Sequence, residues 1–336
     1  MKKRNIVFGA IIGFVLIVAL FYMLFFSAPQ KQAETERFIV SLNSTQNSIL
    51  QKLYSDGFVK SAWASQLVLY STKIDPGAYK IGKNMSVFKL AKVLGAEPYM
   101  KWVVIPEGLR KEQIGEMLTQ TLGWTKQMKT DWITKDTAQS SYYIEGVYFP
   151  DTYLLSKEED TMKIAERFVN KFNEKFQPYA DKFVKENIKW DTAIKIASIV
   201  QREAAGKDDM PLIAGILWNR LLKNMRLEVD ATIQYMRDDI AHYGVVRTTN
   251  QPKEYKNNGD WWKPIKPDDK KIESPYNTYK NAGLPPHPIC NPGLEAIAAV
   301  LNPTKTECLF YLHDTNGQIH CSKTYEEHQK NIEKFL

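Results

Sequence analysis

The chain begins with a long apolar segment. Residues 6–26 contain no charged side chain and end in the bulky stretch from Phe21 to Phe26. A helix of this length rises about 30 Å, which is the thickness of the hydrocarbon core of a bilayer. A cleaved signal peptide would have a shorter apolar region followed by small residues at a cleavage site. The pattern therefore predicts an uncleaved transmembrane helix over residues 6–26.

Polar residues 27–36 follow this segment and predict a short stalk. Beyond the stalk, two weakly similar units each show an alternating strand, a hydroxyl residue suited to a helix N-cap, and an apolar helical stripe. A strand over residues 101–105 then ends at Pro106. These units predict a small α+β module over residues 37–106. The five recurring pairs are Phe38/Tyr79, Val40/Ile81, Thr45/Ser86, Ile49/Leu90 and Leu53/Leu94.

The remaining pattern predicts a larger mixed α+β domain over residues 107–336. Apolar positions recur at helical spacing over residues 109–118, and a stripe of Phe residues four apart predicts a long helix over residues 161–187. Residues 131–141 are mostly polar and predict a connection. Residues 246–271 are rich in Pro, Asn, Asp and Lys, which predicts a long surface loop.

One helix of this domain carries a candidate general acid, Glu203. The helix is predicted with Asp191 or Thr192 as its N-cap and Gly206 at its end. Glu203 lies about 20° from Ile196 around the axis, so its carboxyl group leaves the helix on the apolar side. Partial burial and the negative end of the helix dipole both raise the pKa of such a group, as a general acid requires. From this helix alone, a structural Glu paired with a buried Arg remains the alternative.

Polar and aromatic residues that suit sugar binding follow this helix. Asn219 lies near the far end of the next predicted helix, and residues 226–235 predict an extended stretch that carries Asp230 and Tyr235. Six of the 16 prolines fall within residues 275–303, and such a run fixes a rigid path. Rigid loops that hold amides and aromatic rings can pair with sugar hydroxyls. A strengthened loop without a ligand is the alternative.

Composition and charge narrow the class of protein and the kinds of partner that the chain can have. Apolar residues make up 44% and aromatic residues 12% of the chain, which predicts a folded core. The net charge is +7, and Lys2, Lys3 and Arg4 supply three of these charges, which leaves about +4. Without another Lys/Arg run, the sequence predicts no nucleic-acid partner. The basic cluster precedes the apolar segment, so residues 1–5 are expected in the cytoplasm and the domains on the other side of the membrane.

The cysteines and histidines do not suggest a metal site. Three cysteines, Cys290, Cys308 and Cys321, lack CxxC or Cys/His metal spacing, and the five histidines form no HExxH pattern. An oxidising compartment would allow a Cys308–Cys321 disulfide, but the expected state is three thiols packed as small hydrophobic residues. No metal or cofactor is predicted.

Sequence blocks around these residues carry a family resemblance. They occur in the order A-S-I-V-Q-R-E, L-W-N-R-L, R-L-E-V-D-A-T-I-Q-Y, S-P-Y-N-T-Y, G-L-P-P-H-P-I-C-N-P-G-L-E-A-I and H-C-S-K-T-Y-E-E-H, after I-P-E-G-L-R and E-G-V-Y-F-P-D-T-Y. Over most of residues 35–336 the chain resembles the YceG-like (MltG) endolytic murein transglycosylases. The resemblance implies an N-terminal anchor, a LysM-like α+β module and a larger catalytic domain.

The resemblance also implies roles for single residues. The family's catalytic Glu falls on Glu203, and Gln201 stands where many relatives have a second Glu. Three departures are Ala231 in place of a usual Pro, Cys321 in place of an aromatic residue, and Gln329 in place of Asn. The implied substrate-cleft positions are Asn219, Asp230, Tyr235, Tyr276, Asn277, His320, Glu327 and His328.

The implied activity is cleavage of the β-1,4 bond between N-acetylmuramic acid and N-acetylglucosamine without water, which forms a 1,6-anhydro ring. The implied setting is the bacterial cell membrane, where nascent glycan strands emerge beside peptidoglycan synthases and division or elongation proteins. Two alternatives remain. One is a hydrolytic muramidase with Asp230 as a second carboxylate, and the other is a non-enzymatic wall-binding scaffold.

Overall fold

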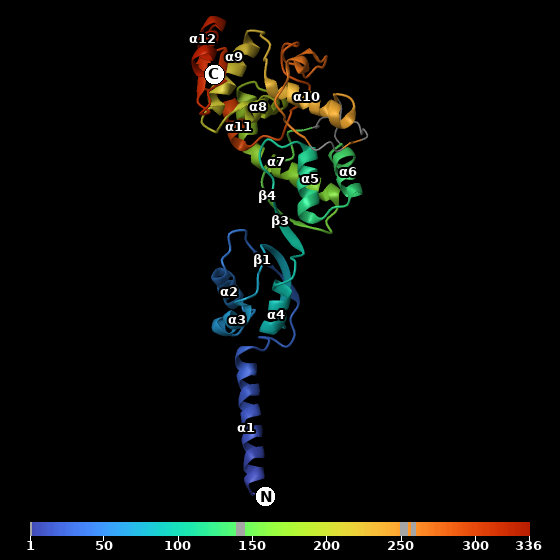
Figure 1. Cartoon of the computed structure of the whole chain (residues 1–336), viewed down its shortest axis with the longest axis vertical. Coiled ribbons are helices and arrows are strands. Elements are labelled where there is room, and N and C mark those ends of the chain that lie inside the picture. The colour runs from blue at the N-terminus through green and yellow to red at the C-terminus, as the bar shows by residue number, and fades with distance from the viewer. Residues whose placement is uncertain (1, 139–144, 249–254, 257–259) are drawn as a thin grey trace. The chain divides into compact units, whose positions relative to one another are not determined.

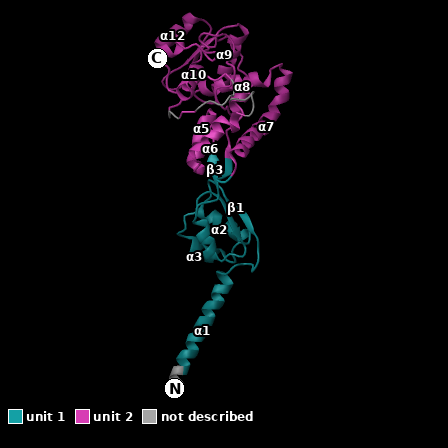
Figure 2. Cartoon of the chain, turned by 90° about the vertical axis from the view of Figure 1, so that its right-hand side faces the viewer, with its two compact units in different colours: residues 1–103, 153–158 teal, residues 104–152, 159–336 magenta. Residues whose placement is uncertain are grey.

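The computed structural model describes residues 2–138, 145–248, 255–256 and 260–336, and the chain forms two compact units. The first unit comprises residues 1–103 and 153–158, and the second comprises residues 104–152 and 159–336 (Figure 2). Both units contain helices and strands, so the chain is a mixed α+β protein with an apolar helix at its N-terminus (Figure 1).

The N-terminal helix α1 (Lys2–Phe25) is the apolar segment expected from the sequence. Within the described residues, it is the helix that is long and apolar enough to cross a membrane, and none of its apolar window is buried. Length and composition alone suit either a membrane anchor or a signal sequence.

The rest of the first unit is a four-stranded sheet with three helices, in the strand order β1-β2-β3-β4. Strands β1 and β2 pair antiparallel, with Phe38 opposite Tyr79, so two positions of the predicted repeat face each other across the ladder. The elements are β1 (Thr35–Val40), α2 (Gln46–Ser55), α3 (Ala62–Leu69), β2 (Gly77–Gly82), α4 (Val87–Leu94), β3 (Met100–Val104) and β4 (Thr152–Ser156).

The helix starts of this unit agree with the repeat pattern. The side chain of Thr45 accepts a hydrogen bond from the Ser48 amide at the start of α2, and Ser86 does the same for Lys89 at the start of α4. Both N-cap predictions are thereby confirmed. Helix α3 was not predicted, and it supplies a third helix to the unit.

The second unit is mostly helical. Helix α8 lies among α7, α9, α10 and α11, and its apolar stripe is fully buried there (Figure 1). The elements are α5 (Lys111–Leu122), α6 (Lys126–Thr134), α7 (Thr161–Lys185), α8 (Trp190–Glu203), α9 (Met210–Leu222), α10 (Asp230–Tyr243), α11 (Leu294–Leu301), β5 (Phe310–His313), β6 (Ile319–Ser322) and α12 (Tyr325–Phe335), with 3₁₀ turns at Asp136–Ala138 and Pro267–Lys271.

Three local predictions for this unit were wrong. The stretch carrying Asp230 and Tyr235 is the start of helix α10, because its buried residues recur at helical rather than alternating spacing. Residues 131–134 belong to helix α6, not to a connection, and residues 139–141 lie outside the described part. Helix α8 begins at Trp190 and ends at Glu203, so neither the predicted caps nor Gly206 bound it.

The cysteines also differ from the expectation. Cys308 and Cys321 form a disulfide with a Cα–Cα distance of 5.8 Å, and Cys290 is a buried thiol. Cys308 lies just before β5, and Cys321 lies in β6 opposite Tyr311 of β5. The β5–β6 hairpin therefore brings the two cysteines together. The prediction of three thiols was wrong because it ignored this hairpin.

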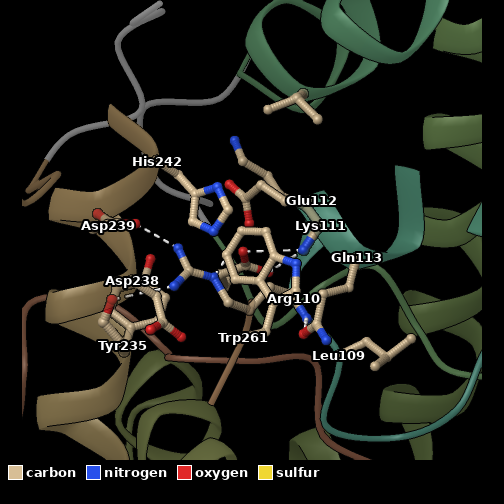
Figure 3. A network of polar contacts seen from close by, with 12 residues as sticks. Leu109, Arg110, Lys111, Glu112, Gln113, Tyr235, Asp238, Asp239, His242 and Trp261 are labelled. Atoms are coloured by element: carbon tan, nitrogen blue, oxygen red, sulfur yellow. Dashed lines mark hydrogen bonds and ion pairs between the residues drawn. The ribbon is translucent and has the colours of Figure 1, made fainter. Parts of the chain in front are cut away.

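A buried ionic network fixes the start of α5 against α10 (Figure 3). The guanidinium group of Arg110 pairs with Glu112 and Asp239 and lies between the rings of Tyr235 and Trp261, at 4.1 and 4.9 Å from their centroids. The side chains of all three charged residues are fully buried. Every charge here has an opposite partner, as burial requires.

Candidate active site

A cavity of about 490 Å³ opens in the second unit beside Glu203. Its walls come from the end of α8, the end of α9, the start of α10, strand β5 and helix α12, together with residues from the segments between them. This volume is in the usual range for a ligand site. The lining residues are Glu203, Arg220, Leu227, Glu228, Asp230, Lys270, Tyr279, Leu309, Phe310, Tyr311, Leu312, His313, Tyr325, His328 and Ile332.

Glu203 is the last residue of α8, and two donors hold its carboxyl group in place. The Ala231 amide donates to Oε1 at 3.2 Å, and the hydroxyl of Tyr311 donates to Oε2 at 2.8 Å. Ala231 lies in the first turn of α10, where backbone amides have no partner within the helix. The carboxyl group is therefore oriented from both sides by groups that carry no net charge.

The surroundings of Glu203 raise the pKa of its carboxyl group above the usual value. Burial is the main cause, and the negative charge of Asp230 acts in the same direction. The hydrogen bonds from Tyr311 and Ala231 and the nearby His313 lower the pKa and offset only part of this effect. The direction agrees with the sequence prediction and suits a group that has to donate a proton.

Strand β5 contributes two residues that the sequence analysis missed. Tyr311 and His313 alternate on the strand and both line the cavity. The Nε2 atom of His313 lies 2.7 Å from Oδ2 of Asp209, and Asp209 also accepts the amides of Ala205 and Gly206 just after α8. The short aromatic and apolar run F-Y-L-H suits a strand, but it gives no local signal of the contact with Glu203.

Asp230 is the first residue of α10, directly before the donor Ala231. Its Oδ1 atom accepts a hydrogen bond of 2.5 Å from the hydroxyl of Tyr279. The ammonium group of Lys270 lies 3.9 Å from the same oxygen and 4.0 Å from the centroid of the Tyr279 ring. Asp230 thus has a cation and a hydroxyl beside it, whereas Glu203 has no cation within ion-pair distance in the described structure.

The comparisons with known proteins bear on this site. The sequence model of the YceG-like family matches residues 38–334, which is most of the chain. The chain belongs to the YceG-like family.

Named YceG-like relatives come from several bacteria. The chain is 29% identical over 318 residues to the endolytic murein transglycosylase of Bacillus subtilis, covering 87% of this chain and 82% of that protein. It is 27% identical over 303 residues to the endolytic murein transglycosylase of Streptococcus pneumoniae D39, covering 79% of this chain and about half (51%) of the longer pneumococcal protein. A crystal structure of a YceG-like protein from Listeria monocytogenes matches 89% of this chain and 99% of that one, with a TM-score of 0.57 and 26% identity.

Of the residues predicted for this YceG-like site, Asp230 and His328 line the cavity together with Glu203. His328 stacks on the ring of Phe310 at 5.5 Å between centroids, and burial lowers the pKa of its imidazole. Tyr279, which belongs to the same sequence block as the predicted Tyr276 and Asn277, also lines the cavity and was missed.

Three predicted residues of the YceG-like chain bind backbone groups of loops or of a helix start instead. The side chain of Asn219 donates to the carbonyl groups of Thr306 and Cys308, before β5. The side chain of Asn277 donates to the carbonyl groups of Lys270 and Ile272. Glu327 accepts the Thr324 amide in the capping box of α12. None of the three lines the cavity beside Glu203, so a sugar contact for them stays a prediction.

The other three predicted residues also lie outside the lining of this cavity. Tyr235 and Tyr276 are fully buried and pack with ring centroids 4.8 Å apart. The imidazole of His320 lies 3.0 Å from Asp314 and stacks on Phe335. These contacts stabilise the domain, and a role toward substrate stays a prediction.

The YceG-like cavity contains three carboxylates, Glu203, Glu228 and Asp230, among the described residues. Gln201, two residues before the end of α8, accepts the Gly293 amide at 2.9 Å and does not line the cavity. Within the described residues, no three His, Cys, Asp or Glu side chains are placed to hold a metal ion.

Proposed function

We propose that this chain is a membrane-anchored endolytic murein transglycosylase, with Glu203 as its acid–base residue. Two kinds of observation support the proposal. Curated relatives that match most of the chain carry the name endolytic murein transglycosylase. The site supplies a carboxyl group at a cavity, held by two uncharged donors and with a raised pKa. The carboxyl geometry of Glu203 is the observation that carries the mechanism.

In the proposed mechanism, Glu203 acts first as an acid and then as a base. The protonated carboxyl group gives its proton to the glycosidic oxygen that leaves C1 of the muramic acid. The resulting carboxylate then takes the proton from the C6 hydroxyl of the same sugar, and this hydroxyl attacks C1 to close the 1,6-anhydro ring. Because the nucleophile belongs to the substrate, the reaction needs no bound water and no second catalytic carboxylate.

The two donors suit both halves of this cycle. In the acid step, burial raises the pKa of the carboxyl group and so favours its protonated form. Once the proton has left, the Tyr311 hydroxyl and the Ala231 amide stabilise the carboxylate. Asp230, with its partner Tyr279, is the group proposed to stabilise positive charge that develops at C1 or to orient the acetamido group. Asn277, whose amide is occupied by backbone carbonyls, is less suited to that role.

A hydrolytic muramidase is the second candidate, because Asp230 lines the same cavity as Glu203. The two reactions leave different products, so mass spectrometry of purified sacculi digested by the full chain separates them. The expected products end in 1,6-anhydro-muramic acid. Reducing ends in their place would show hydrolysis through a second carboxylate. Absence of any released glycan would favour a non-enzymatic scaffold.

The proposed setting is the bacterial cell membrane, with α1 as a single-pass anchor and residues 1–5 in the cytoplasm. Its support is the apolar length of α1 and the basic residues before it. The unit that follows, for which the family resemblance implies a LysM-like module, is proposed to hold glycan near emerging strands. Peptidoglycan synthases and division or elongation proteins are the proposed partners.

A further inference from the structure

Helix α3 of the first unit carries an apolar stripe on its exposed side. Trp63, Leu67 and Tyr70 recur at positions i, i+4 and i+7, and they are 44%, 66% and 78% exposed. This spacing places the three side chains on one face of the helix. The opposite face is buried through Ala64 and Leu69. Helix α3 therefore presents large apolar side chains to its surroundings as well as to the core of its own unit.

The stripe begins where the apolar helix α1 ends. The ring of Trp63 lies 5.2 Å from that of Phe25 and 6.0 Å from those of Phe21 and Phe26, between centroids. Phe88, a half-exposed residue of α4, lies 5.8 Å from Phe26. The last residues of the apolar segment therefore contact both α3 and α4, and the exposed aromatic rings of the unit continue from it.

Hydrogen bonds attach the end of α1 directly to the folded unit. The Val87 amide donates to the carbonyl of Phe26 at 3.1 Å. The ammonium group of Lys60, just before α3, donates to the carbonyl of Met23 at 2.9 Å, at the C-terminal end of α1 where a cation is favoured. These bonds fix the distance between the membrane-length helix and the exposed stripe.

We infer that the α3 stripe of Trp63, Leu67 and Tyr70 lies in the lipid–water interface of the bilayer that α1 spans. The inference rests on the proposed role of α1 as an anchor. Trp and Tyr rings favour the headgroup level of a membrane, and a helix with an apolar outer face can lie within it. A spanning α1 brings that interface to Phe26, and Trp63 already contacts Phe26. The first unit is then held at the membrane surface by contacts additional to the anchor.

An environment-sensitive fluorophore on the full chain in phospholipid vesicles tests the inference. The label is placed on Leu67→Cys, with Leu42→Cys as the matched control. Leu42 is 44% exposed and lies two residues after the end of β1 (Thr35–Val40). The six residues of β1 span about 20 Å, so the control position lies about that far from the start of the strand. The native cysteines are buried or in a disulfide, so they do not compete for the label.

The expected result is a label at position 67 that is shielded several-fold from aqueous iodide and quenched by lipids with nitroxide headgroups. The label at position 42 is expected to show the opposite behaviour. Equal iodide access at both positions, in protein that stays with the vesicles after alkaline extraction, would overturn this inference alone. Shielding at position 67 without lipid quenching would also overturn it, because a second copy or another protein would then cover the stripe. Loss of both labelled proteins from the vesicles would overturn the anchor as well.

Discussion

Two carboxyl groups of the second unit, Glu112 and Glu203, lie in opposite electrostatic surroundings. Burial by itself raises the pKa of Glu112, but Arg247 and Arg110 outweigh it and hold that pKa well below its usual range. Burial also raises the pKa of Glu203, and there the opposing groups are mainly two uncharged donors, so the net shift is upward. The surroundings of Glu112 favour its ionised form, whereas those of Glu203 favour the protonated form that can give a proton away.

This difference separates a charge that stabilises the fold from one that is available for chemistry. Glu112 belongs to a buried network in which Arg110 and Arg247 pair with it. Glu203 faces a cavity of about 490 Å³ and has no ion-pair partner there. A raised pKa has little functional meaning without such access.

The largest expected effect comes from replacing Glu203 with Gln. The amide cannot donate a proton to the leaving oxygen, so we expect glycan release from sacculi to fall by about 10²–10⁴-fold. The matched control is Glu228→Gln, which changes another cavity carboxylate that pairs with Arg220. Turnover near the wild-type level in Glu203→Gln, or equal losses in both variants, would remove Glu203 from its proposed role.

Arg110→Met tests the other half of the comparison. It leaves Glu112 and Asp239 buried with one cation fewer, so we expect the free energy of unfolding to fall by about 3–5 kcal/mol. Urea denaturation followed by circular dichroism measures the change. Arg167→Met is the control, because Arg167 pairs with Glu159 in a partly exposed position where about 1 kcal/mol or less is expected. Equal losses in the two variants would contradict a special role for the buried network.

The Cys308–Cys321 disulfide closes the β5–β6 hairpin that carries Tyr311. Replacing both Cys308 and Cys321 with Ser opens a loop with a separation of 13 residues, so we expect a loss of about 2–4 kcal/mol in the free energy of unfolding. Reducing agent provides the control. It should destabilise the wild-type chain by a similar amount and leave the double variant unchanged. If reduction has no effect on the wild type, the disulfide contributes nothing measurable.

Tyr311→Phe should give the smallest effect and sharpen the assignment of the acid. The Tyr311 hydroxyl lowers the pKa of Glu203, so its removal should raise that pKa further. The acid must be protonated, and activity is lost as pH rises through its pKa. The alkaline limb of kcat/KM against pH should therefore move to higher pH, with a change in kcat of about tenfold.

Tyr325→Phe is the control for this pH profile, because Tyr325 lines the cavity and no hydrogen bond joins it to Glu203 in the described structure. An alkaline limb that stays in place in Tyr311→Phe would mean that the limb reports another group. A limb that moves equally in both variants would indicate a general change in the cavity.

Local patterns predicted some of these features well. The apolar stripe of α8 placed Glu203 on the buried side, and the hydroxyl residues Thr45 and Ser86 marked two helix starts. Each of these conclusions depends on residues within a few positions of one another. The family resemblance then added the proposed role of Glu203, which the helix pattern alone could not distinguish from a structural Glu.

Contacts between distant segments could not be read from local patterns. Tyr311 is 108 positions from Glu203, and the β5–β6 hairpin that presents it is also what joins Cys308 to Cys321. The start of α10 was read as extended, although its buried residues recur at helical spacing through Tyr243. That error concealed the Ala231 amide, because only a helix start leaves such a donor free for Glu203.

The identity of residue 231 therefore affects the acidity of a side chain 28 positions away. A proline at this position, which the family resemblance implies for many relatives, would have no amide hydrogen and could not donate to Glu203. Proline also suits the first turn of a helix, so the two residues are nearly interchangeable for α10 itself. Alanine gives this chain an additional hydrogen bond that favours the carboxylate. One backbone hydrogen at the start of α10 is thus a means of adjusting the acidity of Glu203 without changing any side chain of the cavity.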